Sequence, residues 1–360
     1  GSVDGKTTFV LDSNTLNLNY FVRLPEAEYT VYLLVKDNTT QVTWRQGFDL
    51  KVTSTTNEGW LILSDVNGFS RLDMVSTSGK EEMMVRDIWA DSPLALRKGP
   101  RKIAHYPDMN EYSSGAHPVY FVADGGTVKL DPDDFSYDPL NEFMYEFGKW
   151  DPDFVPTDLK GNYSNFWRFC VGKNGIYAKN DMTSGSIYGQ PLNKIKGEND
   201  YFGVAPAIYY AYEPAVVFYD TTNLRFVQLT SDLQSMRLLT AEEKYFSFQT
   251  GRKFVYMTGT LHDNDGMIFA ILRDNADKYW MYGMKAGSFS ALSQDKDSYF
   301  QIEAPDIEKA TAFAIHPTSY YLFYVVGNQI HQLDMTSRRH RVLPITFPDS
   351  KQSYQEKKLR

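Results

Sequence analysis

The sequence predicts an all-β protein in which a β-propeller follows part of a β-sandwich. Three observations support this fold class. Aromatic residues make up 15% of the 360 residues, and Tyr and Phe favour strands. The 24 Gly and 16 Pro supply many turns. Apolar runs that end in a Gly, Asn or Asp turn and lead into a second strand recur at roughly 50-residue intervals, as in propeller blades.

Six expected hairpins carry this repeat. They span residues 59–74, 118–130, 167–178, 215–229, 267–282 and 320–333. Strand-like runs at 205–212, 254–260 and 310–316 precede three of them and give each an inner strand. Stacking such sheets in a ring buries apolar faces that a lone sheet would expose. We therefore expect six blades, or seven if residues 131–160 hide a further hairpin. A β-solenoid and a two-layer sandwich are the rival architectures.

The first part of the chain has a different pattern. Residues 29–38 and 42–52 alternate along their length and residues 16–22 do so in part, with Val31, Leu33 and Val35 on one face. Three or four strands are too few to close a core. The domains we expect are a partial sandwich at 1–53, a propeller-like domain at 54–350 and a flexible tail at 351–360. The Gly1-Ser2 start resembles a processing remnant, so we expect that an upstream segment was removed.

Charge and cysteine content exclude several classes of protein. The formal net charge is −8 and there is no block of Lys and Arg, whereas a nucleic-acid surface needs a basic field. No apolar run approaches the roughly 18 residues of a membrane span. Cys170 is the only cysteine, so an intrachain disulfide cannot form, and its strand-like surroundings predict a buried, inert thiol.

Familiar catalytic and metal-binding motifs are absent from the sequence. It contains no nucleophile elbow, phosphate loop or His-Glu-x-x-His helix. Asp131, Asp133 and Glu142 occupy positions 1, 3 and 12 of a calcium loop, but Phe135 and Ser136 break the pattern. We therefore predict no catalytic residue, no metal and no cofactor, although blades could still assemble a site from distant residues.

Aromatic and basic residues in the expected connections between blades are the candidate ligand-binding residues. They are Trp89, Arg101, Lys102, Tyr201 and Arg252. Arg101 and Arg252 each precede an expected inner strand, so both are predicted to point into one mouth and to hold an anion. Long loops that gather on one face of a propeller build a ligand surface, and flat rings stack on sugars. The alternative is that the aromatics pack between blades and the basic residues are solvated.

The start of the chain resembles a known family. Residues 29–37, Tyr-Thr-Val-Tyr-Leu-Leu-Val-Lys-Asp, resemble the closing strands of a PKD-type immunoglobulin-like domain. Gly-Trp-Leu-Ile-Leu-Ser follows at 59–64. This succession resembles the PKD-like family of surface lipoproteins in Bacteroidetes, in which an immunoglobulin-like region precedes a propeller-like domain. The resemblance implies an extracytoplasmic place at the outer membrane or cell surface, and a link to glycan or nutrient uptake. Any lipid anchor would lie upstream of residue 1.

Three functions agree with these observations. The first is a non-catalytic extracytoplasmic binding protein that takes a glycan or a protein ligand at the propeller mouth. The second is a propeller-type glycosidase or lyase, which would need carboxylates or a His/Tyr pair to converge at the central channel. The third is a structural subunit of an outer-membrane uptake complex. Because one fold serves many functions, the fold cannot choose among them.

Overall fold

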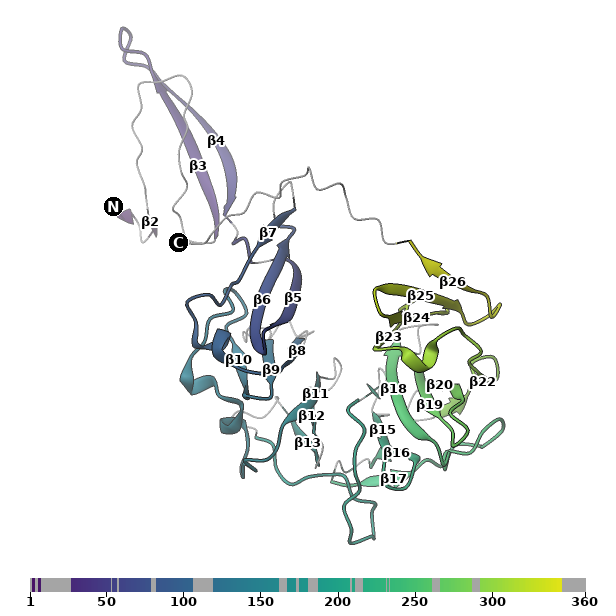
Figure 1. Cartoon of the computed structure of the whole chain (residues 1–360). Helices are drawn as coiled ribbons and strands as arrows, with labels where there is room; N and C mark the ends of the chain where they lie inside the picture. Colours follow the sequence, from purple (N-terminus) through teal and green to yellow (C-terminus); the bar gives the residue numbers. More distant parts are fainter. Residues whose placement is uncertain are drawn as a thin grey trace.

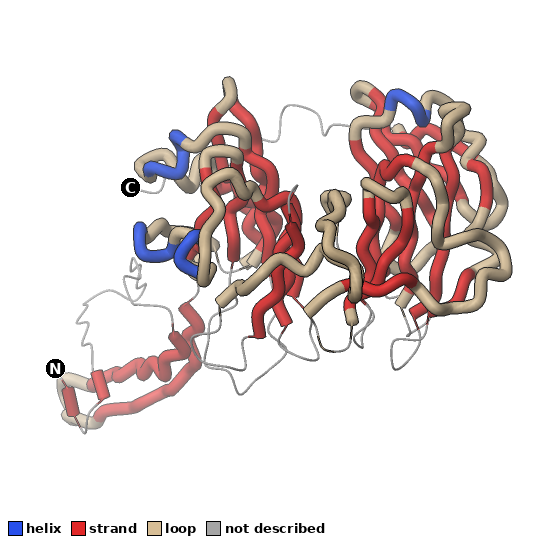
Figure 2. The backbone as a smooth tube through the Cα atoms, turned by 90° about the horizontal axis from the view of Figure 1, so that it is seen from below, coloured by secondary structure: helices blue, strands red, loops and turns tan. Residues whose placement is uncertain are grey.

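The structure is a computed structural model of the whole chain. It describes residues 2–3, 6–7, 27–52, 54–56, 58–78, 82–105, 119–161, 167–172, 175–180, 187–207, 209–210, 216–230, 232, 234–260, 266–286 and 292–344. Strands form almost all of the regular structure, and the helices are short 3-10 turns (Figure 2). The described residues are thus all-β, as predicted, and their sheets are antiparallel.

Six sheets of three or more strands follow one another along the described chain, and we number them in that order. The first three are three-stranded. The first sheet consists of β5 (Gly59–Val66), β6 (Phe69–Ser76) and β7 (Met83–Val85). The second consists of β8 (Pro100–His105), β9 (Val119–Ala123) and β10 (Gly126–Leu130). The third consists of β11 (Pro156–Gly161), β12 (Trp167–Gly172) and β13 (Gly175–Asn180).

The last three sheets have four or five strands. The fourth consists of β14 (Tyr209–Tyr210), β15 (Val216–Asp220), β16 (Arg225–Leu229) and β17 (Met236–Leu238). The fifth consists of β18 (Lys253–Thr260), β19 (Met267–Arg273), β20 (Tyr279–Ala286), β21 (Leu292–Gln294) and β22 (Phe300–Gln301). The sixth consists of β23 (Ala312–Ile315), β24 (Tyr321–Val326), β25 (Gln329–Asp334) and β26 (His340–Leu343).

The remaining elements lie outside these sheets. β1 (Ser2–Val3) pairs with β2 (Lys6–Thr7), and β3 (Ala27–Lys36) pairs with β4 (Thr43–Val52) in a ribbon that projects away from the six sheets (Figure 1). The 3-10 helices are η1 (Pro93–Leu96), η2 (Pro139–Asn141), η3 (Phe143–Glu146) and η5 (Ile307–Lys309). Apolar side chains of the β3–β4 ribbon, such as Leu34 and Trp44, are exposed, as expected for a sheet too small to close a core.

The six sheets are arranged in chain order around an arc (Figure 1). Their first strands lie innermost, where β5 contacts β8, β8 contacts β11, β14 contacts β18 and β18 contacts β23. One hydrophobic core lies between each pair of consecutive sheets, which gives five cores among the described residues. Packing between neighbouring sheets therefore holds the arc together.

The second strand of each inner sheet shows why these runs are apolar at every position. In β9, Phe121 packs in the core shared with the first sheet, while Tyr120 packs in the core shared with the third. In β19, Ile268 faces the fourth sheet and Phe269 faces the sixth. Successive side chains of a strand point to opposite faces. A strand covered on both faces must therefore be hydrophobic throughout.

The six predicted hairpins are confirmed as β5–β6, β9–β10, β12–β13, β15–β16, β19–β20 and β24–β25. The inner strands expected at 254–260 and 310–316 are β18 and β23. Residues 131–155 hold two 3-10 helices and no strand, so they do not contain a further hairpin. The strand expected at 16–22 lies outside the described residues.

Buried tyrosines predict a loss of stability in alkali. Burial raises the pKa of Tyr219 and of Tyr324 from 10 to about 12. A phenol that binds its proton more tightly in the folded state contributes stability below pH 10, and that contribution is lost as the pH rises to about 12. We expect guanidinium unfolding midpoints to fall once the pH exceeds 10, and Tyr219→Phe to reduce the slope. A midpoint constant across pH 10 would contradict this.

Candidate functional site

The inner strands of the second and third sheets share a local irregularity at their first residues. Pro100 pairs with Ala123 and Lys102 with Val122, so Arg101 is an extra residue in β8. In β11, Pro156 pairs with Gly172 and Asp158 with Val171, so Thr157 is the extra residue. A β-bulge bends its strand and redirects a side chain. Proline suits the first position of an edge strand because it has no N–H to donate.

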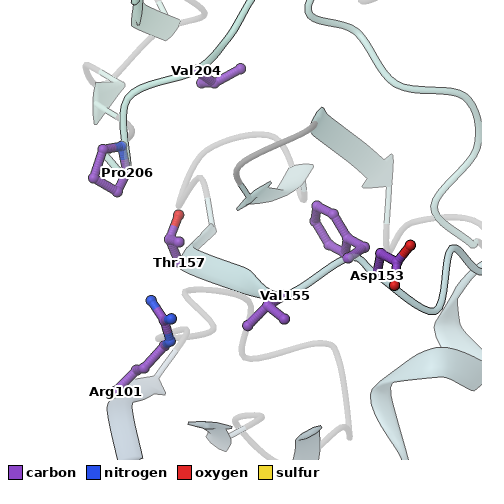
Figure 3. Close-up of a pocket in the computed structure, with 7 residues that line it drawn as sticks. Arg101, Asp153, Val155, Thr157, Val204 and Pro206 are labelled. Carbon is purple, nitrogen blue, oxygen red and sulfur yellow. The ribbon is translucent and has the colours of Figure 1, made fainter. Parts of the chain in front are cut away.

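The two bulged residues line the same pocket (Figure 3). Its volume is about 450 Å³, within the range of small-molecule sites. The lining residues are Arg101, Asp153, Phe154, Val155, Thr157, Val204 and Pro206. They come from β8, from β11 and the residues before it, and from the segment that leads into β14. The pocket thus lies where the first strands of three consecutive sheets begin.

The pocket offers one cation, one carboxylate and a hydroxyl on mostly apolar walls. Arg101 forms an ion pair with Asp124, which sits in the β9–β10 turn, and both side chains are about half exposed. Exposed ion pairs of this kind contribute little stability, so a ligand anion could replace Asp124 at small cost. The Thr157 hydroxyl donates to the carbonyl of Val171 at 3.1 Å, and its lone pairs are available to accept a further hydrogen bond.

A second group of charges extends from the pocket along the inner strands. Lys102 of β8 forms an ion pair with Asp158 of β11, and the Asp158 side chain is only 8% exposed. Desolvation by the surrounding chain is the main effect that lowers the pKa of Lys160. The positive charge of Lys102 lowers this pKa further, and the negative charge of Asp158 partly offsets both effects by raising it. Lys160 is itself exposed.

Arg252 is not among the residues that line the pocket with Arg101, so this pocket does not bring the two predicted arginines together. The guanidinium carbon of Arg252 lies 4.0 Å from the centre of the Trp280 ring, and its Nη1 donates to the hydroxyl of Tyr282. Both partners belong to β20, the third strand of the fifth sheet. The bulge in β18 falls at Val255, so the counterpart of Arg101 in that sheet is apolar. Arg101 and Arg252 have similar positions in sequence, but the bulge falls at Arg101 in β8 and at Val255 in β18, so their registers differ.

The other predicted residues are also placed. Trp89 is 1% exposed and packs against Phe121, so it belongs to the core between the first two sheets and offers a ligand no surface. Lys102 lies beside the pocket and is paired as described above. Tyr201 is 55% exposed. It is not among the lining residues.

Sequence reasoning missed Thr157, Asp153 and Val204. One signal was available for the first of these. Pro-Arg-Lys at 100–102 and Pro-Thr-Asp at 156–158 occupy equivalent registers at the start of two inner strands. Recognising that repeat would have placed Thr157 beside Arg101.

No protein-family model and no curated protein matches the sequence. A Lactobacillus plantarum protein structure has a TM-score of 0.44 and 11% identity, over 87% of this chain and 90% of that one. The extracellular domain of a putative hybrid two component system from B. thetaiotaomicron has a TM-score of 0.44 and 13% identity, over 87% of this chain and 42% of that one. The structure of apo AztD from Citrobacter koseri has a TM-score of 0.35 and 11% identity, over 83% of this chain and 74% of that one.

Two further findings concern the part of the chain that the structure describes. No helix there is both long enough and apolar enough to cross a membrane. No group of three or more His, Cys, Asp or Glu side chains in that same part of the chain could hold a metal ion. The pocket around Arg101 is the candidate site, and its lining presents a guanidinium, a carboxylate and a hydroxyl.

Proposed function

We propose that the chain is a non-catalytic, extracytoplasmic binding protein whose six sheets are the blades of a β-propeller. Its ligand is a glycan with an acidic group, held at the mouth of the ring. In this proposal the protein is a surface lipoprotein of the PKD-like type, anchored through an upstream segment at the outer membrane, and serves glycan or nutrient uptake. The support for the cell-surface part is the resemblance of residues 29–37 and 59–64 to that family.

One observation supports the ligand class. A β-bulge turns Arg101 into a pocket of about 450 Å³ together with Thr157 and Asp153. A guanidinium forms paired hydrogen bonds with a carboxylate in fixed geometry. Thr157 and Asp153 offer acceptors to sugar hydroxyls, and Val155, Val204 and Pro206 supply apolar wall. A uronic acid presents a carboxylate, hydroxyls and an apolar ring face within one sugar unit.

The test is a titration with oligogalacturonides, followed by calorimetry. We expect Arg101→Ala to weaken binding by about 10- to 100-fold, since hydrogen bonds to charged groups contribute about 1.5–3 kcal/mol. We expect fully methyl-esterified oligomers, which lack the carboxylate, to bind the wild type as weakly as the acidic oligomers bind the variant.

Arg273→Ala is the matched control. Its side chain is 38% exposed and lies 3.4 Å from Asp277, so it resembles Arg101 in exposure and pairing but does not line the pocket. Equal binding by wild type and Arg101→Ala would refute the site. Equal binding of acidic and esterified oligomers would refute the ligand class, and cleavage of any oligomer would refute the non-catalytic assignment.

A further inference from the structure

Two histidines of the sixth sheet form a pair that takes no part in the candidate site. His331 of β25 lies opposite Val342 of β26, and Leu333 of β25 lies opposite His340 of β26. The two imidazoles are therefore diagonal neighbours on one face of the sheet. Nδ1 of His331 lies 3.0 Å from Nε2 of His340, which is hydrogen-bonding distance, and the ring centres are 5.1 Å apart.

The pair lies on the face that packs against the fifth sheet. Leu333, two residues after His331, and Tyr324, which pairs with His331 from β24, are both buried in that core. His331 is 3% exposed, and its ring centre lies 4.7 Å from that of Tyr324. The Tyr324 hydroxyl donates to the carbonyl of Pro305 at 2.7 Å, which fixes the ring. His340 is half-buried, so the pair reaches solvent only on that side.

The hydrogen bonds decide where the protons of the neutral pair lie. One ring must donate to the other, because two N–H groups or two bare nitrogens facing each other would repel. Nε2 of His331 is buried and has no hydrogen-bond partner among the described residues. A buried N–H without an acceptor is rarer in proteins than an unpaired acceptor. The network therefore places the shared proton on Nδ1 of His331, which donates to Nε2 of His340.

A further proton has no favourable position in this arrangement. On Nε2 of His331 it would put a charge and a donor into an apolar core, where no described atom accepts it. On Nε2 of His340 it would set two N–H groups against each other and break the bond between the rings. Burial, and next the charge of His331, accordingly lower the pKa of His340 from its ordinary value of 6.5.

The groups around the pair do not replace the histidines as its acid-sensitive element. Burial raises the pKa of Tyr324 to about 12, and the charges of Asp306 and Glu308 raise it further. Asp306 is already paired with Lys309 at 2.6 Å, and that hydrogen bond is the main effect that lowers its pKa. The fifth sheet contributes apolar side chains and tyrosines to this core. Histidine is the side chain whose ordinary pKa lies between pH 5 and 8.

We propose that the His331–His340 pair is an acid-sensitive latch, which holds β26 on the sixth sheet and releases it as the pH falls below about 6.5. β26 is the outermost strand of that sheet (Figure 1). Its other side chains anchor it little, because Arg341 and Val342 are exposed. Beyond the latch, Arg341 donates to the side chain of Gln332 at 2.7 and 3.0 Å on the opposite face.

Linkage gives the direction of the effect. When β26 detaches, His340 regains its ordinary pKa of 6.5, so the open form binds more protons than the closed form below that pH. The latch is therefore fully closed above pH 6.5, and opening becomes more favourable as the pH falls. Because β26 is a peripheral strand, its release does not require the rest of the molecule to unfold.

Hydrogen exchange at graded pH tests the latch. Between about pH 7.5 and 5, after correction for the intrinsic rates, we expect protection of the β26 amides to fall by up to about tenfold per pH unit, the limit for uptake of one proton. Protection of β19 should stay constant. His340→Gln keeps a side chain that forms hydrogen bonds but does not titrate, so protection of β26 should not depend on pH in this variant.

His316→Gln is the matched control. His316 is also a half-buried histidine of the sixth sheet, and its Nδ1 accepts the N–H of Ser319 at 3.0 Å, but it lies outside the pair. This variant should keep the pH dependence of the wild type. The ring NMR signals of wild-type protein give a readout that does not depend on any substitution, since His340 should titrate with a midpoint below 6.5.

Each other outcome overturns the proposal. Constant protection of β26 in the wild type would show that the pair does not control the strand. An equal loss in β19 would show acid unfolding of the whole molecule. A loss that persists in His340→Gln or vanishes in His316→Gln would assign the effect to another group, and a His340 midpoint at or above 6.5 would show that the closed form tolerates the proton. No ligand is used, so this test is independent of the proposed glycan site.

Discussion

Replacing Asp220 with alanine is expected to lower the free energy of unfolding by about 3–5 kcal/mol, the cost of breaking a buried ion pair. The Asp220 side chain is fully buried, and one of its oxygens accepts the Nε of Arg225 at 2.8 Å. The carboxylate also accepts the backbone N–H groups of Thr222 and Asn223. Alanine would leave the turn donors without their acceptor and the nearly buried Arg225 guanidinium with only the carboxylate of Glu198, 3.7 Å away.

Asp274 is the matched control, because it holds the corresponding turn of the fifth sheet. Its carboxylate accepts the N–H groups of Ala276 and Lys278 and the indole N–H of Trp280, each at 2.9 Å. No arginine depends on it in the same way, and it is only partly buried. We expect Asp274→Ala to cost about 1–2 kcal/mol, as for other lost caps. Guanidinium unfolding of both variants measures the difference, and equal costs would contradict the importance assigned to burial.

Replacing Trp89 with alanine is expected to lower the free energy of unfolding by about 3–5 kcal/mol. The ring is 1% exposed, its centre lies 4.6 Å from that of Phe121, and its Nε1 donates to the carbonyl of Phe135 at 3.1 Å. The substitution would open a cavity between the first two sheets and leave a buried carbonyl unpaired. Thermal and guanidinium unfolding would measure this.

Trp89→Phe separates packing from ligand contact. It keeps most of the ring volume but loses the hydrogen bond to Phe135, so we expect a cost of about 1–3 kcal/mol. Because Trp89 lies in the core, affinity for acidic oligogalacturonides should not change in this variant. A loss of affinity with little loss of stability would return Trp89 to the ligand-binding residues and contradict its assignment to the core.

Most of the β-structure could be predicted because its signals are local. A hairpin such as β15–β16 needs an apolar strand, a turn anchored by Asp220 and a second strand, all within residues 216–229. These preferences act between residues close in sequence, so the chain shows them without knowledge of the fold. The burial of the Cys170 thiol could also be predicted locally, from the apolar strand-like run around it. Burial raises the pKa of this thiol well above its usual value.

The candidate site could be predicted only in part. Arg101 was identified from its place before an inner strand, and it lines the pocket. Arg252 has a similar place in sequence, but its guanidinium lies against Trp280 of the third strand. The difference arises from strand register, since the bulge falls at Arg101 in β8 and at Val255 in β18. A shift of one residue turns a side chain to the opposite face of a sheet.

The sequence by itself determined the six hairpins, where they turn and which of their apolar runs need cover on both faces, because period and turn chemistry act over a few residues. Only the tertiary structure decided what covers each face and which side chains meet. Trp89 and Trp60 illustrate this: both are tryptophans of the first sheet and its connection, yet one is 1% exposed and the other 74%. Burial depends on the neighbouring sheet, which the chain supplies from residues distant in sequence.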